Sequence, residues 1–110
     1  MGKEQLITAS LSAYVFAEDG NFVAYCPELD MSAAGTDEED ARTSLSEVLS
    51  IYFNDTISRG TLEEDLLAHG WRKRGSSVAE PTTSTMLRRP ALRSIMGKRE
   101  FHKYPMPLDV

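Results

Sequence analysis

The sequence predicts a small α+β domain: a three-stranded antiparallel sheet, a long helix and a short helix, then a C-terminal helix and a terminal strand or arm. Three observations support this fold class: an apolar alternation of period two near the N-terminus, an Asp-Gly pair typical of a hairpin, and two capping boxes that open helices. The chain has 110 residues, enough for one small domain or a domain with a tail. We expect the helices to cover one face of the sheet.

Three strands are predicted in the first third of the chain. Apolar and polar residues alternate over residues 6–16, which indicates a strand with one buried face. The Asp-Gly pair at 19–20 favours a tight turn, because glycine tolerates a positive φ. The return strand is then expected over residues 22–26, and a short third strand over residues 31–34.

Two capping boxes, at residues 36–39 and 61–64, predict two helices that follow the strands. The first helix should run over residues 37–59, where apolar residues recur at intervals of three and four and form one stripe, and Gly60 is expected to cap its C-terminal end. The second helix should end near His69, and Trp71 just beyond it is expected to pack against the body of the domain.

The last third of the chain predicts less regular structure. Residues 72–84 are polar and rich in Gly, Ser, Thr and Pro, which is typical of a connector. Residues 84–97 carry a weaker amphipathic helix pattern that Pro90 should break or restart. Residues 101–110 alternate again, and their two prolines confine a last strand to a sheet edge or an extended arm. We thus divide the chain into an α+β domain over residues 1–71 and a linker over residues 72–84. A C-terminal helix and strand follow over residues 85–110 and pack on the domain or on a partner.

The net charge of −5 conceals an uneven distribution of charge along the chain. Residues 1–67 carry 3 basic and 14 acidic side chains, a net charge of −11, whereas residues 68–110 carry 9 basic and 3 acidic ones, a net charge of +6. Either the two parts attract each other, or each binds a partner of opposite charge, or the charges only solvate the surface.

The sequence predicts no catalytic site, no metal site and no cofactor. It contains no Gly-rich phosphate loop, nucleophile elbow or HExxH motif, and His69 and His102 stand alone. The single cysteine, Cys26, is interpreted as a small buried residue and indicates a reducing compartment. Because no apolar run is long enough to span a bilayer and the N-terminus lacks a signal-peptide core, we expect a cytoplasmic protein without a membrane partner.

Two segments resemble the HicB family of antitoxins: residues 22–30, which read Phe-Val-Ala-Tyr-Cys-Pro-Glu-Leu-Asp, and residues 34–41, which read Ala-Gly-Thr-Asp-Glu-Glu-Asp-Ala. Members of that family show a hairpin, a Pro-acid-apolar turn and a Gly-Thr/Asp-x-x-Glu-Ala helix start in this spacing. The family's turn usually holds a glycine where this chain has the sequence Asp-Met-Ser at 30–32. The segments at 69–71, 85–93 and 102–107 are also similar to a compact branch of HicB-like proteins without an evident C-terminal DNA-binding module.

The resemblance implies a partial ribonuclease-H-like fold, in the order β-β-β-α-β, that lacks catalytic carboxylates. It also implies a partner, a small basic ribonuclease toxin of the HicA type, which the acidic body would attract and neutralise. Homo-oligomers through exposed strand edges are expected as well. The residues predicted to contact the partner are Tyr25, Glu28, Asp30, Phe101 and Tyr104.

A second hypothesis is that the protein is a transcriptional regulator that binds operator DNA through its basic C-terminal third. In that case the predicted nucleic-acid contacts are Arg88, Arg89 and Arg93. Neither aromatic interleaving nor a helix-turn-helix pattern accompanies these arginines. A steep salt dependence of duplex DNA binding would distinguish the regulator from the antitoxin.

Overall fold

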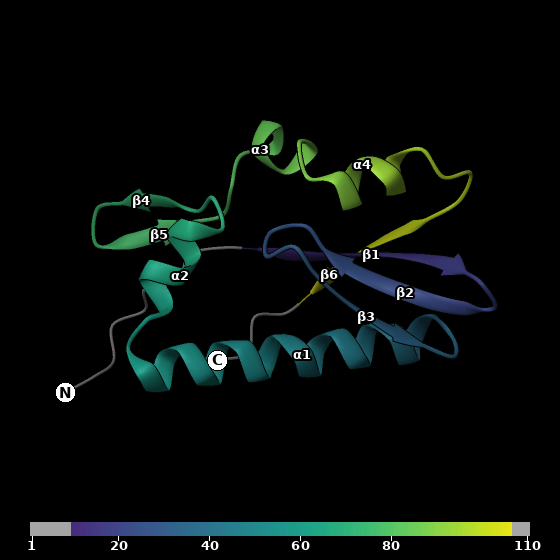
Figure 1. Cartoon of the computed structure of the whole chain (residues 1–110), viewed down its shortest axis with the longest axis horizontal. Coiled ribbons are helices and arrows are strands. Elements are labelled where there is room, and N and C mark those ends of the chain that lie inside the picture. The colour runs from purple at the N-terminus through teal and green to yellow at the C-terminus, as the bar shows by residue number, and fades with distance from the viewer. Residues whose placement is uncertain (1–9, 107–110) are drawn as a thin grey trace.

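A computed structural model of the chain describes residues 10–106, and a four-stranded antiparallel sheet lies at its centre. The sheet has the strand order β3-β2-β1-β6, so the last strand of the chain lies beside the first (Figure 1). Its strands are β1 (Leu11–Glu18), β2 (Asn21–Cys26), β3 (Met31–Gly35) and β6 (His102–Met106). The strand predicted at the C-terminal end therefore forms at a sheet edge, as expected, and the parts of the predicted strands at 6–9 and 107–110 lie outside the described residues.

Four helices and a small hairpin complete the described structure. The helices are α1 (Glu38–Arg59), α2 (Leu62–Ala68), α3 (Thr83–Leu87) and α4 (Pro90–Met96). The separate hairpin consists of β4 (Arg72–Arg74) and β5 (Ser77–Ala79). The α+β class with a long helix and shorter helices is thus confirmed.

The sheet is covered on both faces, whereas the sequence predicted helices on one face only. Leu11, Ala13 and Val15 of β1 point toward α1 and join the larger core cluster. The alternate residue Phe16 points the other way and packs with Ile95 of α4 in a second cluster. The prediction was wrong because the second face of β1 and β2 is itself apolar enough to bury one side of a short helix. Figure 1 shows α1 on one side of the sheet and α4 on the other.

The start of α1 uses a capping arrangement one residue later than the predicted box. Asp37 is the N-cap, and its side chain accepts a hydrogen bond from the amide of Asp40 at 2.7 Å. The carboxylate of Asp40 accepts in return from the amide of Thr36 at 2.8 Å. Asp37 takes the cap because its backbone is extended, with φ −146° and ψ −178°, as an N-cap requires. At the other end Gly60 closes α1 in the left-handed region, at φ 73°, as the sequence predicted.

The second predicted capping box does not form. Thr61 precedes α2, but its backbone at φ −114° and ψ 11° is not extended and its side chain makes no cap hydrogen bond. Its amide instead donates to the carbonyl of Thr56 at 2.9 Å, because α2 begins immediately after α1 ends. Trp71 beyond α2 is buried, as expected, and Pro90 restarts the last helical segment as α4.

The segment predicted as a connector, residues 72–84, contains the β4–β5 hairpin. Gly75 sits in its two-residue turn with φ 62°, a conformation that glycine adopts without strain. Val78 of β5 is 1% exposed and belongs to the larger core cluster. The polar composition concealed the hairpin because Val78 and Ala79 are its only buried apolar residues.

Candidate functional site

The end of β2 and the turn between β2 and β3 carry three of the predicted contact residues, and the structure buries one carboxylate there. Glu28 is 5% exposed, and its carboxylate accepts hydrogen bonds from the Ser12 amide at 3.0 Å and the Ser12 hydroxyl at 2.7 Å. The thiol of Cys26 lies 3.4 Å from the same carboxylate. The indole of Trp71 donates to the main-chain oxygen of Glu28 at 2.9 Å. Glu28 thus joins β1, β2 and the end of α2 from a buried position.

Tyr25 and Asp30 lie together at the other side of this turn. The Tyr25 hydroxyl donates to the Asp30 carboxylate at 2.6 Å, while the tyrosine ring is 3% exposed beneath α4. Burial, and then the bond to Asp30, raises the pKa of Tyr25 above its ordinary value, so its hydroxyl stays protonated at neutral pH. Asp30 itself is exposed and adopts a left-handed backbone at φ 57°. Of these three residues, only Asp30 is exposed to solvent.

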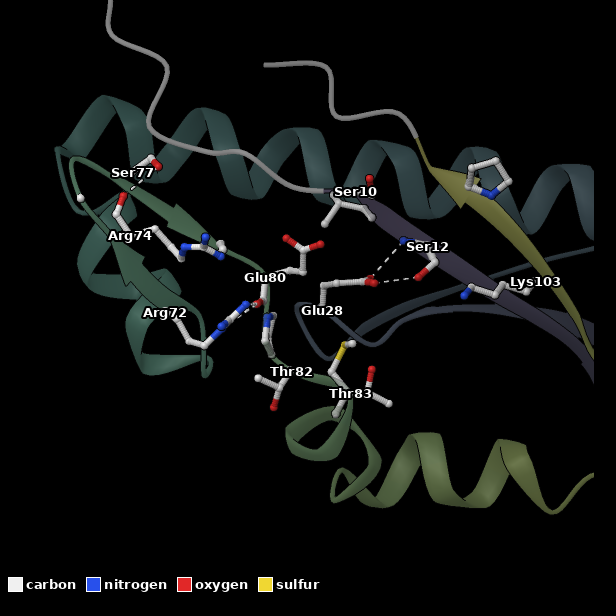
Figure 2. A pocket seen from close by; sticks show the side chains of 16 residues that line it. Ser10, Ser12, Glu28, Arg72, Arg74, Ser77, Glu80, Thr82, Thr83 and Lys103 are labelled. Atoms are coloured by element: carbon white, nitrogen blue, oxygen red, sulfur yellow. Dashed lines mark hydrogen bonds between the residues drawn. The ribbon is translucent and has the colours of Figure 1, made fainter.

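An open cavity of about 1140 Å³ lies beside Glu28, between the sheet and the β4–β5 hairpin. Figure 2 shows Arg72 and Arg74 on the hairpin side and Lys103 of β6 on the opposite side. The guanidinium of Arg72 faces the main-chain oxygen of Glu80 at 3.4 Å. The lining therefore mixes cationic groups at the rim with the Glu28 carboxylate, whose oxygens are already hydrogen-bonded.

The other two predicted contact residues lie on opposite faces of the sheet and do not join the turn. Tyr104 donates to Glu38 at 2.6 Å, on the side of α1, and the guanidinium of Arg42 lies 4.1 Å from the centre of its ring. Phe101 packs with Tyr14 on the side of α4, at a ring-centroid distance of 5.8 Å. Both aromatic rings are half-buried. The five predicted residues therefore form no single patch.

Glu38 is a residue that sequence reasoning assigned only to the first turn of the helix. Besides Tyr104, the ring of His102 lies within 2.7 Å of its carboxylate, so two residues of β6 hold the start of α1. The bond from Tyr104, and then the one from His102, keep the pKa of the Glu38 carboxyl below its ordinary value. No spacing signal could reveal this cluster, because the two β6 residues lie more than sixty positions away along the chain.

The three arginines predicted to bind nucleic acid differ in their surroundings. Arg89 is half-buried and donates to the main-chain oxygen of His69 at 2.7 Å, which ties the start of α4 to the end of α2. Arg88 and Arg93 are exposed. Two further cations lie over aromatic rings on the same side of the sheet: Lys98 over Phe16, and Lys103 over Tyr14.

Charge of opposite sign covers opposite layers of the molecule. The outer surface of α1 exposes Glu39, Asp40, Glu47 and Asp55. The layer formed by α3, α4 and the segment after it exposes Arg88, Arg93 and Arg99. The sheet separates the two layers (Figure 1), so the acidic and basic parts of the sequence do not neutralise each other across their main surfaces. Between the two parts of the sequence, the salt bridges found within residues 10–106 join Lys73 to Glu63 and His102 to Glu38.

The polar side chains around the turn are engaged in hydrogen bonds with one another. Burial, and then the Glu28 carboxylate, raises the pKa of the Cys26 thiol to about 12, so little reactive thiolate forms at neutral pH. The Ser12 hydroxyl donates to a carboxylate and has no imidazole beside it. In residues 10–106, no three histidine, cysteine or acidic side chains gather as metal ligands would. None of the helices described here has the length and apolar character needed to cross a membrane.

Comparisons with protein-family models, with curated proteins and with solved structures found no match for this chain.

Proposed function

We propose that this chain is a non-catalytic, HicB-like antitoxin with a partial ribonuclease-H-like fold, which binds and neutralises a small basic ribonuclease of the HicA type. The observation that supports the proposal is the acidic outer layer of α1, separated by the sheet from the basic layer. An uncompensated acidic surface attracts a cationic partner from solution and speeds the encounter. The order of three strands, a long helix and a later edge strand agrees with the resemblance that motivated the proposal.

Asp30 and the exposed acids of α1 are the contact residues in this proposal. Glu39 and Glu47 are exposed on α1, and no salt bridge to either is found among residues 10–106. Tyr25 and Glu28 would act indirectly, because they hold the turn that presents Asp30. This revises the set of direct contacts predicted from sequence: Tyr25 and Glu28 become positioning residues.

The test is co-expression of the tagged chain with the product of the reading frame beside its own gene, followed by co-purification and a ribonuclease assay. We expect a stoichiometric complex in which ribonuclease activity is suppressed. The variant Glu39→Lys/Glu47→Lys should weaken the complex by about tenfold at low salt, because it reverses charges that attract the partner. The matched control is Arg88→Glu/Arg93→Glu on the opposite layer, which should bind at least as well as the wild type. Absence of a complex, or an equal loss in the control, would refute the proposal.

The exposed Arg88 and Arg93 keep one alternative open, a nucleic-acid-binding regulator. Titration of operator-length duplex DNA at two salt concentrations tests it, because each phosphate contact steepens the salt dependence. A tight complex that weakens in Arg88→Ala/Arg93→Ala would favour the regulator over the antitoxin. Arg89 is unsuitable for this test, since its bond to His69 gives it a structural role.

A further inference from the structure

The two edges of the sheet differ in how they resist pairing with another strand. β6 forms one edge and carries Lys103 and Pro105, a charged residue and a residue without an amide hydrogen. β3 forms the other edge and reads Met-Ser-Ala-Ala-Gly, with neither charge nor proline. Natural proteins protect exposed edges with such residues, so β3 is the unprotected edge of the sheet.

The hydrogen-bonding direction of each edge residue follows from the turn between β1 and β2. Asp19 and Gly20, at φ 53° and 84°, form a two-residue turn, which makes Glu18 and Asn21 a hydrogen-bonded pair. In an antiparallel sheet, hydrogen-bonded and non-hydrogen-bonded residue pairs alternate along each pair of strands. When this alternation is followed from the Glu18–Asn21 pair through the observed registers, the amides of Ser32 and Ala34 point away from β2.

The same alternation provides a check at the other edge. It directs Lys103 and Pro105 of β6 away from β1, and an outward position is where an edge strand tolerates proline. The outer edge of β6 therefore offers fewer donors than its length suggests. The outer edge of β3 offers both of its amides, at Ser32 and Ala34, and their side chains are small and exposed.

An apolar pair on α1 lies beside the unprotected edge. Arg42 leans toward β6, where it stacks on Tyr104. Ile51 follows Arg42 by nine positions, about two and a half helical turns, so it lies on the side of α1 opposite to Arg42 and away from β6. Ile51 is 68% exposed and Val48, one turn earlier, is 37% exposed; Ile57 of the same helix is 49% exposed.

The position of α1 matches the spacing that two copies would need. α1 packs mainly over β3 and β2. Because α1 lies over β3 and β2, its axis would be about one strand spacing from the midline of a β3–β3 pair. The α1 axes of the two copies would then lie two strand spacings apart, which is about 10 Å. That distance is the spacing of directly packed helices. A second copy of this chain therefore fits both the strand edge and the apolar pair at once.

We propose that two copies of this chain pair through antiparallel β3 strands into one continuous eight-stranded sheet, with Val48 and Ile51 of each α1 packed against the other α1. A two-fold axis at Ala33 places Ser32 opposite Ala34 of the second copy, so the outward amides of both strands meet in about four main-chain hydrogen bonds. Because the edge alone is short, the helix contact supplies the rest of the buried area. The inference does not depend on the proposed antitoxin function.

The acidic character of α1 sets an unusual salt dependence for this dimer. The two helices repel each other through exposed acids such as Glu47, whereas Asp55 is paired with Arg59 at 3.1 Å. Raising the salt concentration from 0.1 M to 1 M shortens the Debye length from about 10 Å to about 3 Å and screens that repulsion. The dimer should therefore tighten with salt, opposite to an association driven by the acidic and basic layers of different copies.

The test is the solution mass of the full chain by light scattering, at protein concentrations up to about 100 µM. We expect twice the monomer mass of 12.2 kDa for the wild type. Ala34→Pro, which removes an outward amide, and Ile51→Glu, which removes the exposed apolar side chain, should both be monomeric with unchanged circular dichroism. Met96→Glu is the matched control, because Met96 is also an exposed apolar residue but lies on α4, and it should remain dimeric.

Hydrogen exchange provides a second readout that needs no variant. The amides of Ser32 and Ala34 should gain protection as protein concentration rises, whereas the outward amide of Lys103 should not. A monomeric wild type at high concentration and high salt would overturn the proposal, since the edge would then be unpaired or used by another protein. A dimer unaffected by both Ala34→Pro and Ile51→Glu, or one lost in Met96→Glu, would overturn it as well.

Discussion

The buried carboxylate of Glu28 gives the sharpest test of how the β2–β3 turn is built. We predict that Glu28→Gln lowers the free energy of unfolding by about 2 kcal/mol. Two donors of Ser12 reach this carboxylate, at 3.0 Å and 2.7 Å, and bonds to a charged acceptor contribute about 1.5–3 kcal/mol each. Glutamine keeps the shape and one acceptor oxygen, and the Ser12 hydroxyl can rotate to accept from the new amide. Both bonds become neutral ones of about 1 kcal/mol, which leaves a net loss near the predicted value.

The assay for this prediction is urea unfolding followed by the fluorescence of Trp71, at one fixed protein concentration. Trp71 is the only tryptophan and bonds to the main chain of Glu28, so it reports on this part of the structure. With a urea slope of about 2 kcal/mol per M, the midpoint should fall by about 1 M. Ser12→Ala completes a double-mutant cycle, in which Glu28→Gln should cost less once the hydroxyl is absent.

An unchanged midpoint in Glu28→Gln would refute this reasoning. The carboxylate would then contribute nothing to folding, and the direct partner contact predicted for Glu28 from sequence would become the better explanation of its presence. A lower midpoint with full partner binding by the folded variant would instead leave Glu28 as a purely structural residue. The same variant thus separates stability from recognition at this position.

Three further changes test other contacts. Because the hydrogen bond from Tyr104 lowers the pKa of Glu38, the stability that Glu38 contributes is present at neutral pH and lost as the pH falls through that lowered pKa. The melting temperature of Glu38→Gln should therefore be lower than that of the wild type at pH 7 but equal to it at about pH 2. A difference in melting temperature that persists at about pH 2 would contradict a contribution from the ionised Glu38 carboxylate. Gly35→Ala should lower the free energy of unfolding by about 2 kcal/mol or more, because the added Cβ would lie 2.4 Å from the amide nitrogen of Ala41. Thermal unfolding measures this loss, and an unchanged melting temperature would show that α1 can move to make room. Cys26, whose pKa is about 12 and which is 0% exposed, should resist iodoacetamide in the native protein and react in urea, so rapid native labelling would show that the turn opens.

Local signals in the sequence predicted the elements whose cause is local. The Asp-Gly turn, the glycine after α1 and the proline that begins α4 each act through their own backbone angles, and each lies where the sequence placed it. The capping box of α1 was placed one residue early because Thr36, Asp37, Glu39 and Asp40 all have suitable side chains. Only the backbone angles of the structure decide among such candidates.

Features that depend on distant contacts were not predictable in the same way. The β4–β5 hairpin depends on the burial of Val78 in the larger core, and the layer of α4 depends on Phe16 and Tyr25 from strands far along the chain. Glu28 resembled a free turn residue because its partner Ser12 lies sixteen positions earlier, on a neighbouring strand. A single sequence offers no pattern that links such positions.

The coverage of the sheet restricts where partners can bind. Since α1 covers one face and α4 packs on the other, a partner reaches the outer surfaces of the helices or the strand edges. The edge of β6 is poor in outward donors at Pro105, and the edge of β3 is free of that defect. A dimer through β3 would set two acidic α1 helices side by side and leave Glu39 and Glu47 on their outer surfaces. The two proposals therefore use different parts of α1: its flank for a second copy, and its outer surface for a basic partner.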